Sequence, residues 1–81
     1  MSNQIANVGI VVKDFAKIPE VNALLHHYSD NILSRSGMPY KERGVRLINV
    51  VLDADLGVVR DLNEKLGALG GINAQIMTFE L

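Results

Sequence analysis

Two kinds of apolar pattern alternate along these 81 residues, and their order leaves few possible folds. Ile5 to Val12 and Val45 to Leu52 are rich in β-branched residues, which is typical of strands. Two further segments repeat apolar residues at helical spacing, which predicts amphipathic helices. The first carries Ile18, Val21, Leu24, Leu25, Tyr28 and Ile32, and the second carries Val58, Val59, Leu62, Leu66 and Leu69.

Proline and glycine predict the limits of the first helix and of the strand after it. Pro19 fits a first helical turn, where the missing N–H is not needed. We expect this helix to run to about Leu33 or Arg35. A short strand over Gly37 to Glu42 follows, and because Pro39 cannot donate to a ladder, that strand should lie at a sheet edge.

The second half of the chain completes the pattern. A turn near Glu42 to Gly44 leads into the strand that begins at Val45, and Asp53 or Asp55 can cap the second helix. Gly70-Gly71 ends that helix, and Ile72 to Leu81 forms the last strand. The order predicts an α+β, ferredoxin-like βαββαβ fold in one domain spanning residues 1–81. Its four-stranded antiparallel sheet should carry both helices on one face.

The strands are apolar on both sides, although the helices can cover only one face of the sheet. In the first strand, Val8, Ile10 and Val12 point opposite to Ile5 and Val11; in the third, Val45, Leu47 and Val51 point opposite to Ile48, Val50 and Leu52. A small domain without disulfides also gains stability by association. We therefore expect a homodimer or tetramer formed through the open sheet face, with Asn7, Arg46, Asn49 and Gln75 available to set its register.

Composition excludes several functional classes. The absence of cysteine excludes disulfides, thiolate metal sites and thiol catalysis. A net charge of −1 argues against direct nucleic-acid binding, which requires a basic face. No apolar run reaches the roughly 18 residues of a membrane span. The first residues lack the basic region of a secretory signal, so we expect a cytoplasmic protein that does not contact membranes.

His26 and His27 are the histidines of the chain. Adjacent helical residues diverge by about 100°, so both cannot easily bind one ion from the same helix. A metal site would need Asp30, on the same helical face, or ligands from a neighbouring subunit. We favour surface or interface histidines and keep a metal site at His26, His27 and Asp30 as the alternative.

Basic residues concentrate between Arg35 and Arg46, which holds four of the eight Lys and Arg residues. Hairpin geometry could gather them into an anion site, so the candidate ligand-binding residues are Arg35, Tyr40, Arg43 and Arg46. The alternative is a charged edge strand that discourages aggregation. Because no catalytic pair, nucleophile elbow or phosphate loop is present, we expect neither an enzyme nor a bound cofactor.

The segment VNALLHHYSDNILSRSGMPY, Val21 to Tyr40, resembles the family of iron-only hydrogenase system regulators. The segment KLGALGGINAQ, Lys65 to Gln75, is similar to the second helix of that family and to its glycine-marked exit. The resemblance covers essentially the whole chain. It implies the βαββαβ order and a regulatory role in the expression or assembly of iron-only hydrogenase.

The same region is similar to the ACT-like, tetrameric metal-sensing domain of nickel-responsive repressors. That resemblance places His26 on the first metal-ligand position of the repressors, but Gly37, Pro39 and Val45 occupy the other three. It also implies that the ribbon-helix-helix DNA-binding domain is missing. We therefore expect an oligomeric regulatory module that acts through a protein partner or a small ligand. A metal sensor completed by ligands from a neighbouring subunit is the alternative.

Overall fold

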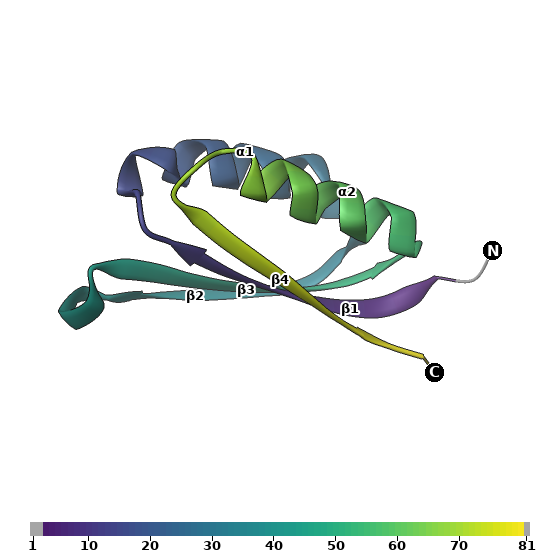
Figure 1. Ribbon diagram of the computed structural model, residues 1–81. Helices are drawn as coiled ribbons and strands as arrows, with labels where there is room; N and C mark the ends of the chain where they lie inside the picture. Colours follow the sequence, from purple (N-terminus) through teal and green to yellow (C-terminus); the bar gives the residue numbers. More distant parts are fainter. Residues whose placement is uncertain (1–2, 81) are drawn as a thin grey trace.

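A computed structural model describes residues 3–80 and contains the elements in the expected order. They are β1 (Gln4–Val12), α1 (Ile18–His27), β2 (Ile32–Tyr40), β3 (Val45–Ala54), α2 (Leu56–Gly67) and β4 (Ile72–Phe79). The four strands form one antiparallel sheet in the order β2-β3-β1-β4. Both helices lie on the same face of it (Figure 1). The predicted α+β, ferredoxin-like βαββαβ fold is confirmed.

The core lies between the helices and one face of the sheet. Alternate residues of the two central strands point into it and are buried, among them Val8, Ile10 and Val12 of β1 and Ile48, Val50 and Leu52 of β3. The helices supply Val21 and Leu25 from α1 and Val59, Leu62 and Leu66 from α2. Each such side chain contributes roughly 1.5–3 kcal/mol by leaving water. The two central strands therefore use this face of the sheet for folding.

Helix α1 is shorter than the sequence predicts. It ends at His27, where the Tyr28 N–H bonds back to the Leu25 carbonyl at 3.1 Å, and a single 3-10 turn follows over Ser29–Asn31. The Asn31 side chain then donates to the Asp53 carbonyl at 3.3 Å. The predicted helical end at Leu33 or Arg35 is wrong, because the chain turns here to join the sheet.

Strand β2 consequently begins at Ile32 rather than at Gly37. The register of its pairing with β3 shifts between Ile32 and Ser34, which leaves Leu33 as an extra residue of a bulge. Pro39 lies in this strand, and β2 is at the sheet edge, as predicted. A 3-10 turn at Lys41–Arg43 and Gly44, with φ of 65°, joins β2 to β3.

Asp55, one of the two predicted caps, begins α2 by accepting a hydrogen bond from the Gly57 N–H at 3.0 Å. α2 ends at Gly67, and its capping residue Ala68 stays right-handed, so the helix stops before the predicted Gly70-Gly71. Gly70 and Gly71 adopt φ of 81° and 68° in the turn that leads to β4. The Gly71 carbonyl accepts the Lys13 N–H at 2.8 Å and so ties this turn to the end of β1. Among the described residues, no helix is long and apolar enough to cross a membrane.

Candidate functional site

The helix-free side of the sheet presents a continuous surface, which we call the open face. The register of the strands places its side chains in rows across the sheet. From one end to the other, the rows are Tyr40–Val45; Met38–Leu47–Val11–Asn73; Ser36–Asn49–Gly9–Gln75; Ser34–Val51–Asn7–Met77; and Asp53–Ile5–Phe79.

The open face is almost uncharged. Among the residues of its five rows, Asp53 is the only one of the Asp, Glu, Lys, Arg and His types. Large apolar side chains are exposed toward both ends, including Met38 and Met77 (each 53% exposed) and Phe79 (48%). The row through Asn49 and Gly9 is polar. An uncharged surface that exposes large apolar side chains on both sides of a polar row is characteristic of an interaction site.

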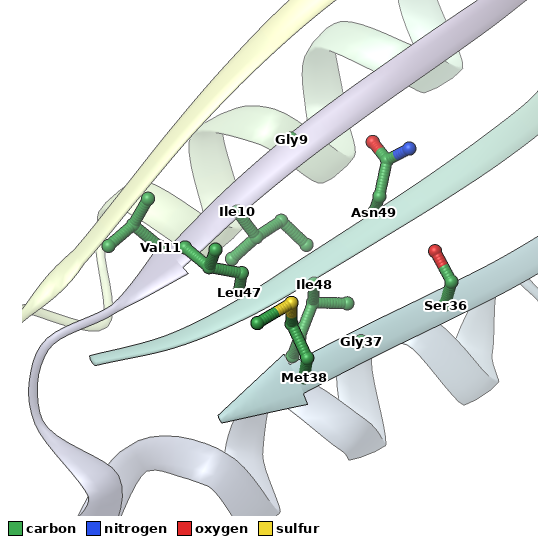
Figure 2. Close-up of a pocket in the computed structure, with 9 residues that line it drawn as sticks. All are labelled: Gly9, Ile10, Val11, Ser36, Gly37, Met38, Leu47, Ile48 and Asn49. Atoms are coloured by element: carbon green, nitrogen blue, oxygen red, sulfur yellow. The ribbon is translucent and has the colours of Figure 1, made fainter. Parts of the chain in front are cut away.

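A hollow of about 440 Å³ lies at the centre of the open face and is lined by residues of β2, β3 and β1 (Figure 2). Gly9, Ser36 and Asn49 line its polar side, and Met38 and Leu47 line its apolar side. A neighbouring hollow of about 260 Å³ shares Gly9 and Asn49 and extends toward β4. The hollows therefore meet at Gly9, where the sheet has no side chain.

Nothing in the described chain itself requires glycine at position 9. Its backbone is outside the positive-φ region, and a Cβ placed on it would meet no atom within 4 Å. A glycine inside a strand weakens that strand and often marks the close approach of a ligand or another backbone. Beside it, the Asn7 Oδ1 is buried without a hydrogen-bond partner among the described residues. Both observations point to an external group at the centre of the open face.

The structure does not bring the four candidate ligand-binding residues together. Tyr40 and Arg43 line one hollow at the end of the open face. Arg35 lies on the helix side, where its Nη2 donates to Asn22 Oδ1 at 2.5 Å. Arg46 pairs in register with Val12, whose side chain is buried under the helices, so it too belongs to the helix side.

Alternation along extended strands explains this separation, because neighbouring residues point to opposite faces. The same alternation corrects the expectation that Arg46 sets register within the open face. The other three residues expected there, Asn7, Asn49 and Gln75, do lie on it.

The histidines lie at the end of α1. His26 lines a hollow of about 220 Å³ with Ser29 and Arg35, and the His27 ring packs edge-on against Tyr28, with ring centroids 5.4 Å apart. Asp30 lies in the 3-10 turn after α1, so the expected shared helical face does not exist. Across residues 3–80, no three His, Asp or Glu side chains are grouped closely enough to hold a metal.

Sequence reasoning missed a cluster formed by Tyr28, Asp61 and Lys65. The Tyr28 hydroxyl donates to Asp61 Oδ2 at 2.5 Å, and Lys65 Nζ lies 3.0 Å from the same oxygen. The spacing of Asp61 and Lys65 on α2 is visible in the sequence, whereas the tyrosine comes from 33 residues earlier. The helix packing alone brings these groups together.

The protonation of this cluster fits a structural role. Burial, followed by the hydrogen bond to Asp61, raises the pKa of Tyr28. Hydrogen bonds from Tyr28 and Lys65 lower the pKa of Asp61, and the bond to Asp61 raises the pKa of Lys65. Each shift favours the form present at neutral pH, so the cluster holds its protons in place rather than exchanging them.

Comparison with known proteins gives consistent results. Residues 4–76 match the model of the TM1266-like family, described as an iron-only hydrogenase system regulator. Among solved structures, the uncharacterized protein TM1266 from Thermotoga maritima is similar, with 30% sequence identity and a TM-score of 0.90. The match covers 96% of this chain and 99% of that one. No curated protein matches the chain.

Proposed function

The chain belongs to the TM1266-like family of iron-only hydrogenase system regulators, and on that premise we propose that it is a non-catalytic regulatory module. It self-associates through the open face and acts through a protein partner or a small ligand. The observation that carries this proposal is an exposed, apolar sheet face whose rows hold Asp53 as their one charged residue.

A second copy of the chain is the occupant that this surface suits. Two open faces can oppose each other with little like-charge repulsion, because Asp53 lies at one end of the face. The exposed methionines supply adaptable apolar contacts. Within residues 3–80 the Asn7 Oδ1 lacks a hydrogen-bond donor, and the partner copy can supply one from Asn7, Asn49 or Gln75.

The size of the open face also suits a dimer. Strands lie about 4.8 Å apart, and residues on one face recur about every 6.7 Å along a strand. Four strands and five rows then give a footprint on the order of 500 Å² per copy, or roughly 1,000 Å² in total. That total reaches the lower limit for a specific interface.

Light scattering on the full chain at micromolar concentration tests this proposal. We expect the unchanged chain to form a dimer or tetramer. Met77→Lys and Met38→Lys place a charge within the open face, so each should raise the dissociation constant by at least about 100-fold. Thr78→Lys is the matched control, because Thr78 is also exposed in β4 but pairs with Ala6 on the helix side.

The control should assemble like the unchanged chain. A monodisperse monomer before any substitution would reject the proposal. Equal effects of Met77→Lys and Thr78→Lys would also reject it, because they would show that the open face is not the surface involved.

The regulatory role is proposed to operate without direct DNA contact. The net charge of −1 provides no excess of cations to neutralise phosphates. A gel-shift experiment at low salt with the upstream region of a hydrogenase operon should show no sequence-specific complex with the isolated chain. Tight, sequence-specific binding would contradict this part of the proposal.

The metal-sensing alternative is tested separately. The Arg35 guanidinium lines the same hollow as His26, and a fixed positive charge there opposes a metal cation. Elemental analysis of protein without a histidine tag, before and after nickel or zinc addition, should find no stoichiometric metal. Bound metal that disappears in His26→Ala would instead favour the sensor.

A further inference from the structure

A separate hollow of about 390 Å³ lies at the end of the open face where β1 stops and β3 begins. Its floor is apolar and consists of Val11, Val45 and Leu47. Its rim carries Lys13, Arg43 and the exposed ring of Tyr40. Lys13 follows β1 and Arg43 lies in the turn before β3, and no carboxylate of the described residues lines the hollow.

The backbone at both cationic residues is held in place. The Lys13 N–H bonds to the Gly71 carbonyl at 2.8 Å. Arg43 ends the 3-10 turn that Gly44 closes, with the Gly44 N–H bonded to the Lys41 carbonyl at 3.1 Å. Folding therefore fixes the positions from which the two side chains extend.

The neighbouring carboxylates do not neutralise these cations. Asp14, next to Lys13, is engaged locally, since its Oδ1 accepts the Ala16 N–H at 3.1 Å. Glu42, next to Arg43, is not among the residues that line the hollow. The ion pairs found within residues 3–80 involve neither Lys13 nor Arg43. Two like charges at one hollow repel each other until an anion lies between them.

We propose that this hollow binds a small organic anion, namely a carboxylate or phosphate monoester that carries a compact apolar group. Arg43 offers a planar, two-pronged donor, and Lys13 adds a mobile charge. The Tyr40 hydroxyl is a further donor. The apolar group would cover the floor at Val11, Val45 and Leu47. Binding uses one chain only; any regulatory effect of it rests on the proposed function.

NMR titration of the full, ¹⁵N-labelled Met77→Lys chain tests the site, with phenyl phosphate as the probe. We expect this variant to be monomeric, and self-association of the unchanged chain would cover Val11, Val45 and Leu47. We expect saturable shifts of the amides at Lys13, Arg43 and Val45, with a dissociation constant of roughly 0.1–1 mM. Inorganic phosphate, without the ring, should bind at least about tenfold more weakly. Benzyl alcohol, without the charge, should cause no saturable shift at these residues.

Charge-removing variants give the test its specificity. Lys13→Gln and Arg43→Gln should each weaken phenyl phosphate binding by about tenfold, as expected for losing one charge-assisted hydrogen bond. Lys41→Gln is the matched control, because Lys41 loses the same charge in the same turn but does not line the hollow. It should change the affinity by less than about twofold.

Two results would overturn the site: no saturable shift up to about 10 mM probe, or an equal loss of affinity in Lys41→Gln. Light scattering on Met77→Lys and on the unchanged chain separates this outcome from the fate of the proposed function. A monomeric Met77→Lys chain that does not bind the probe rejects the site alone. An unchanged chain that is monomeric and binds the probe supports the site and rejects self-association.

Discussion

Tyr28, directly after α1, donates its hydroxyl hydrogen to Asp61, which lies within α2 and 33 residues further along the chain. The tyrosine ring is part of the core, with 7% of its surface exposed. The Asp61 and Lys65 side chains are about half exposed, at 51% and 50%. This bond therefore joins the two helices at the boundary between the core and water.

The ring and the hydroxyl of Tyr28 should contribute separately to stability. Tyr28→Ala removes a buried aromatic side chain and should lower the free energy of unfolding by about 3–5 kcal/mol. Tyr28→Phe keeps the ring and loses only the hydroxyl, so its effect should be smaller but measurable by urea unfolding at pH 7. Tyr40→Phe, at an exposed position, should stay within about 0.5 kcal/mol of the unchanged chain. An equal effect of Tyr28→Phe and Tyr40→Phe would contradict this role.

The contribution of the Tyr28 hydroxyl should depend on pH at the acidic end. Hydrogen bonds from Tyr28 and Lys65 lower the pKa of Asp61 in the folded state. A lowered folded-state pKa gives stability that is complete above about pH 4 and is lost as the pH falls through the folded value. The difference in unfolding free energy between the unchanged chain and Tyr28→Phe should therefore shrink in acid.

The same difference should shrink again in alkali. Burial raises the pKa of Tyr28, and the bond to Asp61 raises the pKa of Lys65. Stability from a raised pKa is complete below the unfolded value, about pH 10, and is lost as the pH rises through the folded value. Urea unfolding of the unchanged chain and of Tyr28→Phe across the pH range checks both the acid and the alkaline decrease. A difference in unfolding free energy that does not change with pH would show that the cluster does not stabilise the fold.

Capping and turn residues predicted the order of helices and strands well, because each of them acts on the backbone next to it. Asp55 caps α2 through its own side chain, and Gly70 and Gly71 supply the left-handed turn between α2 and β4. The end of α1 was mispredicted because Ile32 satisfies two patterns. It continues the helical spacing, yet in the fold it pairs with Leu52 in the sheet. Only the tertiary partner decides between these patterns.

The candidate site could be predicted only in part, for a related reason. In β2, which begins at Ile32, successive side chains point to opposite faces of the sheet. Because the sequence predicted a helix up to Arg35, the face on which each of these side chains lies could not be predicted. Arg35 lies on the helix side, and Tyr40 lies on the open face. Lys13, distant in sequence, joins Tyr40 and Arg43 only once β1 lies beside β3. In contrast, the sequence alone predicted that the strands carry apolar residues on both faces of the sheet.

Gly71 and Gly70 should differ in their tolerance of a side chain. Both have positive φ, so alanine at either position costs about 1 kcal/mol or more. At Gly71 a Cβ would also lie 2.6 Å from the Cβ of Asp14, whereas at Gly70 it would meet nothing within 4 Å. Gly71→Ala should therefore destabilise the chain more than Gly70→Ala does. Thermal unfolding checks the order, and equal losses would show that the contact with Asp14 relaxes freely.

Gly9→Ala should separate the stability of one chain from the association of two. A Cβ at Gly9 meets no atom within 4 Å, and strand residues other than glycine are favoured by up to about 1 kcal/mol. In the Met77→Lys background, which we expect to be monomeric, Gly9→Ala should therefore leave stability unchanged or raise it. In the otherwise unchanged chain it should weaken association by about tenfold, because the methyl group enters the closest part of the proposed interface.

Gly67→Ala is the control for Gly9→Ala. Gly67 also has open space around it, but it lies at the end of α2, away from the open face. Alanine there should stabilise the helix by about 1 kcal/mol and leave association unchanged. Unfolding and light scattering on both variants give the comparison. If Gly9→Ala left association as strong as Gly67→Ala does, the two copies would not meet at the centre of the sheet, and the empty position at Gly9 would need another explanation.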